Sequence, residues 1–134
     1  MIFVLDNNLP PALAHGLAEF TSVTHPQHSV VHLSDVLPRN TPDVDWIENL
    51  AKDKKHVVVT QDRLNKGLER EALRRAGLLV FLLDKGWASH KFWPKAANLV
   101  TWWPEIIEMT EKIEGGAAFR VSWRKAKKFE QIKL

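Results

Sequence analysis

The sequence predicts an α/β fold of three layers, α/β/α, around a central and mainly parallel sheet of four to five strands. Through residues 1–84, apolar runs of strand length alternate with longer amphipathic segments of helix length. This alternation is typical of a parallel sheet whose strands are joined by right-handed helical crossovers. The length of 134 residues and the hydrophobic content of 45% suit one domain. We therefore expect a single domain over 1–134, with an α/β core at 1–84 and, at 85–134, a Trp-rich helical layer, a last strand and a basic tail.

The first strand is predicted at residues 2–5, where four apolar residues stand together, and Asp6 follows it at once. Asn8 is expected to cap a helix whose first turn tolerates the proline pair at 10 and 11. That helix should end near Thr21. Its spacing predicts a buried face formed by Leu9, Leu13, Leu17 and Phe20.

A second short strand is predicted at residues 29–33, followed by a polar connection. Thr41 and Pro42 then suit the N-cap and first position of a second helix, with a buried stripe of Val44, Ile47, Leu50 and Ala51. At about 100° per residue, Asp43 falls inside this apolar arc and Asp45 nearly opposite. Helical phase therefore selects Asp43 over Asp45 as a candidate site residue.

The strongest strand is predicted at residues 56–60, and Asp62 stands two residues past it. A third helix is expected over about 64–76, with Glu69 near its buried side. The inward residues of this helix are Leu64, Leu68, Ala72 and Ala76, with Leu73 at the edge of the arc. Gly77 should end the helix before a fourth strand at 78–83.

The remaining residues predict an added layer. Ser89 is expected to cap a helix carrying Phe92, Trp93, Leu99 and Trp102, and Pro104 to kink or restart it. Alternating residues then predict a half-buried strand at 117–123. The tryptophans of this layer favour a surface for a protein partner over stacking on bases, although Trp on an amphipathic helix is often a core residue.

The acids after the strands suggest a metal site. If the strands are parallel, Asp6 and Asp62 emerge at one edge of the sheet, which Asp43 at a helix start can reach. Carboxylates packed together repel one another unless a cation neutralises them, and oxygen ligands suit Mg²⁺ or Mn²⁺. Such a site can hydrolyse phosphodiesters through a metal-bound water. Each acid alone also has a structural explanation, as a loop cap, a helix-dipole partner, a turn residue or, for Glu69, a boundary residue.

Basic residues beside these acids suggest nucleic-acid contacts. Lys66, Arg70 and Arg74 form a stripe along the third predicted helix, and Arg63 stands nearest the expected metal. We assign these four residues and Asn8 to nucleic-acid binding, although a solvated helix face is the more common explanation of such a stripe. From 119 to 134, six Lys or Arg stand against one acid, which favours a polyanionic or acidic partner or is simply a solvated end.

The first part of the chain resembles the PIN-like domains of the VapC-type ribonuclease toxins. The matching pieces are FVLDNNLPP, TPDVDWIENLA, VVVTQDR and LEREALRRAGLLVFLL, in family order within about 1–83. The resemblance implies a Mg²⁺- or Mn²⁺-dependent endoribonuclease, the toxin of a toxin–antitoxin pair, with a homodimeric state and a cognate antitoxin protein. The acidic residues of the family fall on Asp6, Asp43, Asp62 and Glu69, with the first three as metal ligands.

Two positions depart from the family pattern. Asn7 stands where many relatives carry a second acid, and Arg63 and Leu64 replace the second acid common after Asp62. The alternative interpretation is a catalytically inactive PIN-like module that binds RNA or protein. A receiver-type phosphoacceptor domain is disfavoured, because no adjacent acid pair follows the first strand.

The amino-acid composition restricts the possible chemistry and cellular location of the protein. The absence of cysteine excludes disulfides, thiolate metal sites and a cysteine nucleophile. No stretch reaches the roughly 20 apolar residues of a membrane-spanning helix, and the first residues lack the basic start of a signal peptide. We expect a cytoplasmic protein that does not contact membranes.

Overall fold

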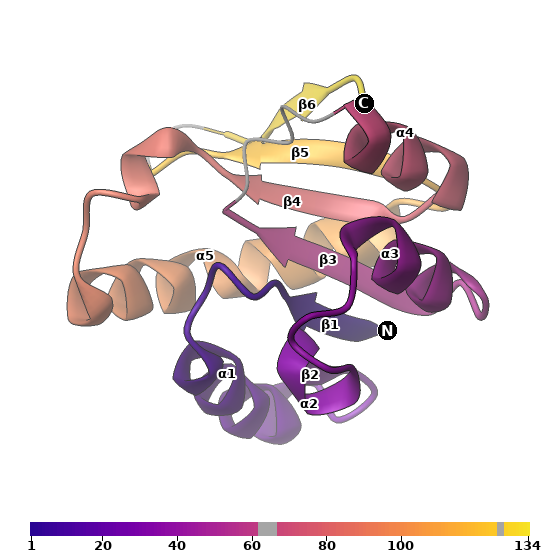
Figure 1. Cartoon of the computed structure of the whole chain (residues 1–134). Coiled ribbons are helices and arrows are strands. Elements are labelled where there is room, and N and C mark those ends of the chain that lie inside the picture. The colour runs from indigo at the N-terminus through magenta and orange to yellow at the C-terminus, as the bar shows by residue number, and fades with distance from the viewer. Residues whose placement is uncertain (62–66, 126–127) are drawn as a thin grey trace.

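The computed structural model describes residues 1–61, 67–125 and 128–134. Within them, six strands form one sheet in the order β2-β1-β3-β4-β5-β6 (Figure 1). The strands are β1 (Ile2–Leu5), β2 (Ser29–His32), β3 (His56–Thr60), β4 (Leu79–Leu83), β5 (Ala117–Val121) and β6 (Glu130–Ile132). Neighbours pair in parallel from β2 through β5, and only β6 is antiparallel. The predicted α/β class and mainly parallel sheet are confirmed, but the sheet has more strands than the four to five expected.

Helices cover both faces of the sheet, which gives three layers. In Figure 1, α3 and α4 lie in front of the strands and α5 runs behind them. The helices are α1 (Pro11–Thr24), α2 (Leu33–Val36), α3 (Asp43–Ala51), α4 (Gly67–Ala76) and α5 (Phe92–Lys112), with a 3₁₀ turn, η1, at Lys85–Trp87. The strands β1, β3 and β4 are buried on both faces, which explains why they read as nearly continuous apolar runs.

Successive side chains of the central strands enter two separate cores. On β3, Val57 and Val59 pack against α1 and α5, whereas Val58 packs against α3 and α4. This alternation follows from the period of two residues along a strand. The α5 core also holds Trp102 and Trp103, which are buried. Trp87 of the same layer is also buried, so the expectation of a partner surface is wrong for these three residues, whereas Trp93 is 79% exposed.

Helix α1, which follows β1 and lies on the same side of the sheet as α5, differs from its prediction. It begins at Pro11 with Pro10 as its N-cap, and the cap residue makes no side-chain hydrogen bond. Asn8 is not the cap, because its side chain bonds to residues at the end of β3. Phe20 is 59% exposed instead of buried, and the helix continues to Thr24.

The other face shows similar shifts at helix ends. The N-cap of α3 is Pro42, while the hydroxyl of Thr41 donates to the Pro38 carbonyl at 2.6 Å. Leu68 in α4 is 77% exposed, and Leu73, expected at the edge of the arc, is fully buried. The segment after β2, expected as a polar connection, contains the short helix α2. The predicted stop at Gly77 is confirmed by its positive φ of 65°.

The C-terminal part of the described chain joins the same sheet. Pro104 lies inside α5, which runs without a break from Phe92 to Lys112 instead of restarting. The tail was not expected to contain a strand, yet Glu130–Ile132 pairs with β5 as β6. In the part of the chain that the structure describes, no helix is long and apolar enough to cross a membrane.

Candidate active site

Three of the predicted acids line one small pocket at the carboxyl ends of the central strands. Its residues are Asp6, Asp43, Trp46, Ile47, Val58, Thr60, Glu69 and Leu73. The acids come from three separate elements, since Asp6 follows β1, Asp43 begins α3 and Glu69 lies in the first turn of α4. The fold therefore collects carboxylates that are far apart in the sequence. Asp62 lies outside the described residues.

Pairing of β1 with β3 places Asp6 beside Thr60. The two strands are in parallel register, and the Asp6 backbone N–H extends the ladder by donating to the Val59 carbonyl at 3.0 Å. The hydroxyl of Thr60 donates to Asp6 Oδ2 at 2.8 Å, and the Asn7 backbone N–H donates to Asp6 Oδ1 at 2.6 Å. Both oxygens of Asp6 thus accept hydrogen bonds that fix the orientation of the carboxylate.

Asp43 is held by its own helix. The indole Nε1 of Trp46, one turn later, donates to Asp43 Oδ1 at 2.8 Å. Trp46 itself lines the pocket and is buried, so its ring is fixed. Asp43 lines the pocket, whereas Asp45 in the same turn is exposed, and the choice of Asp43 as a site residue stays a prediction.

Glu69 is the most buried of the three acids, with an exposed fraction of 7%. It lies in the first turn of α4, as Asp43 lies in the first turn of α3. Helix N-termini carry positive partial charge, which favours carboxylates placed there. The two helix starts thus stabilise negative charge on the α3 and α4 side of the pocket.

The chemistry of this set suits a hard divalent cation. Carboxylates and a hydroxyl provide oxygen donors only, the kind that Mg²⁺ and Mn²⁺ prefer. Asp6, Asp43 and Glu69 are the described residues that could hold such an ion. Among the residues with described positions, however, no group of three or more Asp, Glu, His or Cys is close enough to form a metal site by itself. A complete site would need Asp62, a movement of the acids, or water ligands.

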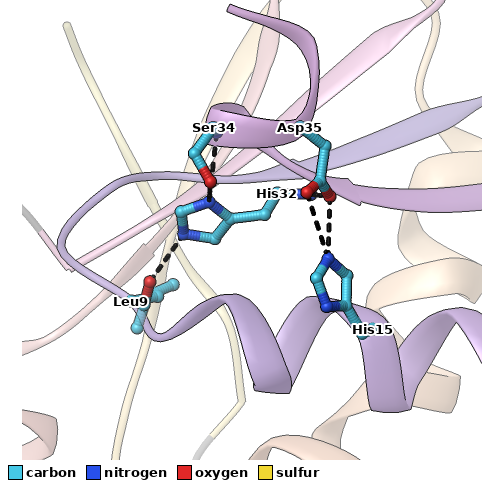
Figure 2. Close-up of polar contacts among 5 residues, drawn as sticks. All are labelled: Leu9, His15, His32, Ser34 and Asp35. Atoms are coloured by element: carbon cyan, nitrogen blue, oxygen red, sulfur yellow. Dashed lines mark hydrogen bonds and ion pairs between the residues drawn. The ribbon is translucent and has the colours of Figure 1, made fainter. Parts of the chain in front are cut away.

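The loop that carries Asp6 is fastened to neighbouring strands. Asn8 donates to Thr60 Oγ1 at 3.2 Å, and its Oδ1 accepts the Gln61 backbone N–H at 3.1 Å. On the other side, the buried ring of His32 bonds through Nε2 to the Leu9 carbonyl at 2.7 Å (Figure 2). A backbone carbonyl only accepts, so Nε2 carries the proton. The loop is therefore clamped between β2 and β3.

The predicted basic stripe is only partly described. Arg63 and Lys66 lie outside the described residues. Arg74 forms an ion pair with Glu71, and Arg70 donates to the Lys133 carbonyl. Both arginines are exposed, and their assignment to nucleic-acid binding stays a prediction, as does that of Asn8.

Sequence reasoning missed the residues that hold the acids. Thr60 could have been suspected, because a polar residue ends an otherwise apolar strand directly before Gln61 and Asp62. Lys95 was also missed. It is 8% exposed and shares a helical face with Leu99 and Trp102, which lie four and seven residues further along α5, so helical phase marks it as a lysine on a buried face. Its ammonium donates to Gln61 Oε1 at 2.8 Å.

Comparisons with known proteins agree with this fold. A family model described as PIN like domain matches residues 1–85, which covers β1 through β4 and the pocket acids. Neither the curated proteins nor the solved structures gave a significant match. The matched region spans more than half of the chain, and the chain therefore belongs to the PIN-like domain family.

Proposed function

We propose that the protein is a Mg²⁺- or Mn²⁺-dependent endoribonuclease. PIN-like domains are generally nucleases, which supports nuclease chemistry in this chain. The observation that carries the proposal is the convergence of Asp6, Asp43 and Glu69, from three different elements, on one pocket. Carboxylates gathered at the carboxyl ends of parallel strands are costly unless a cation offsets their repulsion. Metal binding is the simplest function that explains this arrangement.

The residues of the pocket would act by holding and orienting the ion and the substrate. Asp6, Asp43 and Asp62 would bind the metal. Glu69 would be a further catalytic acid and add negative charge beside these ligands. A bound divalent cation would supply a water of lowered pKa and charge stabilisation for the phosphodiester oxygens. Thr60 and Trp46 would keep Asp6 and Asp43 in fixed orientations, as outer hydrogen bonds do around metal ligands.

We propose RNA as the substrate and a toxin–antitoxin pair as the setting, with a cognate antitoxin, a homodimeric state and a cytoplasmic location. These finer assignments rest on the resemblance of the DNNLPP, TPDVDW and VVVTQDR segments to VapC-type toxins. Co-expression with the neighbouring small reading frame would test the pairing. Toxicity that is unaffected by every neighbouring gene would contradict it.

A catalytically inactive PIN-like module is the second candidate. It is favoured by the described acids, which form no three-residue metal group by themselves, and by the neutral Asn7 beside Asp6. In such a module, the hydrogen bonds from Thr60 and Trp46 would stabilise the carboxylates without a metal. RNA binding that persists in Asp6→Asn, with no cleavage under any metal, would identify it.

The deciding experiment compares acids of the pocket with an acid outside it. We expect the purified protein to cleave single-stranded RNA with Mn²⁺ or Mg²⁺. Asp6→Asn and Asp43→Asn should each reduce cleavage by at least about 100-fold, because they remove a metal ligand. Asp45→Asn is the matched control, since Asp45 is an exposed acid in the same turn of α3. Equal activity in all three variants would overturn the assignment of the site.

A further inference from the structure

Lys95 is a buried cation at the carboxyl end of the sheet, on the opposite face from the acidic pocket. It lies in the first turn of α5, and its side chain has an exposed fraction of only 8%. Its ammonium donates to Gln61 Oε1, and Gln61 directly follows Thr60, which lines the pocket. Hydrogen bonds connect Lys95 to the loop after β1 through Gln61 and Asn8. The acids and this cation therefore lie on the two sides of the end of β3.

Three features make the position of Lys95 unfavourable in the protein alone. Burial removes water from the ammonium and lowers the pKa of Lys95. The positive end of the α5 dipole lies at the same helix start, where the first turn contains no acid and Lys91 as N-cap makes no side-chain hydrogen bond. Among the residues that the structure places, no carboxylate pairs with Lys95, and burial alone shifts its pKa. Within the described part of the chain, the ammonium has three donors and the neutral amide of Gln61 as its hydrogen-bond partner.

An anion at this place would relieve all three costs at once. It would form an ion pair with the ammonium and accept hydrogen bonds from backbone N–H groups in the first turn of α5. Its negative charge would also complement the positive end of the helix dipole. The amide oxygen of the half-buried Gln61 accepts the hydrogen bond from the ammonium. It therefore occupies the place that an anionic oxygen would take.

We infer that Lys95 and the start of α5 form a phosphate subsite for the RNA strand whose cleavage is proposed above. The subsite rests on that proposed function. An RNA strand that crosses the carboxyl end of β3 would place one of its phosphates at the acidic pocket and a neighbouring phosphate at Lys95. The negative pocket alone would repel RNA, and the subsite supplies a positive contact beside it. A phosphodiester displaces the Gln61 amide from the ammonium, while Asn8 keeps the Gln61 backbone in place.

The test measures RNA binding without cleavage. In the Asp6→Asn background, Lys95→Met should weaken the binding of a short single-stranded RNA by about tenfold, measured by fluorescence anisotropy. The dependence of log affinity on log salt should fall by about 0.7, as expected for the loss of one phosphate contact in a single strand. Lys112→Met is the matched control, because it removes the same charge at the other end of α5. We expect it to change binding less than about twofold.

Two further measurements separate binding from a structural role. A buried charge with no ionic partner among the residues of known position costs stability, so Lys95→Met should keep or raise the urea midpoint of unfolding. An oligonucleotide with neutral methylphosphonate linkages should bind equally to the parent and to Lys95→Met. The inference is overturned if Lys95→Met binds RNA like Lys112→Met, or if it destabilises the fold. A parent protein that binds RNA but never cleaves it would defeat the proposed function and leave this binding test intact.

Discussion

The hydroxyl of Thr60 donates a hydrogen bond to Asp6 Oδ2 at 2.8 Å, although 54 positions separate the two residues in the sequence. Thr60 also accepts from the Asn8 amide, so one hydroxyl joins the ends of β1 and β3. Thr60 is 1% exposed, and its hydroxyl therefore keeps a fixed position under the carboxylate. The pocket depends on this contact as well as on its acids.

Thr60→Val tests that contact, because it replaces the hydroxyl with a methyl group of similar size. We expect a loss of stability of about 1 kcal/mol, since the partners of a buried hydroxyl lose their hydrogen bonds. Cleavage should fall by about tenfold or more, because the orientation of Asp6 is no longer fixed. Urea unfolding and RNA cleavage measure the two effects. Thr60→Ser keeps the hydroxyl and should retain most of the activity, and equal loss in both variants would assign the effect to packing.

Trp46→Phe tests the indole that holds Asp43. The variant keeps an aromatic ring but removes the N–H that donates to Asp43 Oδ1 at 2.8 Å. We expect the Mn²⁺ concentration for half-maximal cleavage to rise by about tenfold, the range found when outer hydrogen bonds of metal ligands are lost. Cleavage titrated with Mn²⁺ is the measurement.

Trp103→Phe is the matched control for that experiment. Trp103 is as buried as Trp46, with 4% exposure for each, and its Nε1 donates to Thr21 Oγ1 at 3.0 Å in the core between α1 and α5. The two variants lose the same kind of bond, so their stability costs should be similar. Only Trp46→Phe should change the metal requirement. A parallel change in Trp103→Phe would indicate a general loss of stability instead.

Local sequence patterns were sufficient to predict the central strands, because buried parallel strands are continuous apolar runs. These patterns failed where tertiary contacts decide whether an element forms or a side chain is buried. β6 contains one apolar residue, Ile132, and exists because β5 offers an edge to pair with. Pro104 was expected to interrupt α5, but its side of the helix is exposed, and the faces around it remain packed on the sheet. Phe20 fits the apolar spacing of α1 but lies outside the area that the sheet covers.

The acids of the candidate site could be predicted, but the residues that hold them could not. Asp6 follows a strand and Asp43 shares the phase of a buried stripe, and both features are local. The partners depend on strand order, since Thr60 reaches Asp6 only because β3 pairs directly with β1. Lys95 reaches Gln61 only because α5 covers the face of the sheet opposite α3 and α4. Such pairings cannot be read from spacing along the chain.

The pH dependence of stability should include a contribution from His28. Burial lowers the pKa of this imidazole below its ordinary value of 6.5. Above 6.5 the ring is neutral in both the folded and the unfolded chain, and its full contribution to stability is present. As the pH falls below 6.5, the unfolded chain takes up the proton first, so stability declines until the lower pKa of the folded protein is reached.

His28→Leu tests this contribution. Leucine is apolar and suits the contact of His28 with the edge of Phe3. We expect the urea midpoint of the parent protein to fall between about pH 7 and about pH 5, and the variant to show a smaller fall over the same window. The carboxyl of Asp35 also has a lowered pKa, caused by the hydrogen bond from the His32 backbone N–H. Its contribution is lost below 3.8 and does not enter this window. An unchanged pH dependence in His28→Leu would contradict the assignment.

His32→Leu tests the brace behind the loop that carries Asp6. In the protein, Nδ1 of His32 accepts the Ser34 backbone N–H at 3.1 Å, and Nε2 donates to the Leu9 carbonyl at 2.7 Å (Figure 2). Leucine leaves both backbone groups without their partner in a region where His32 is fully buried. We expect a stability loss of about 2 kcal/mol, since each buried group left unpaired costs about 1 kcal/mol or more. Urea unfolding is the measurement.

Two comparison variants show which of these bonds supports the site. His32→Gln can still donate an amide N–H to the Leu9 carbonyl, and it should retain more cleavage activity than His32→Leu. Ser34→Ala removes only the hydroxyl that contacts Nδ1 at 2.7 Å, and it should cost about 1 kcal/mol with little change in cleavage. Because Leu9 stands three residues after Asp6 in the same loop, loss of its anchor should lower activity beyond the loss of folded protein. If His32→Leu, assayed where it is fully folded, cleaves RNA as fast as the parent, then β2 does not position the loop for catalysis.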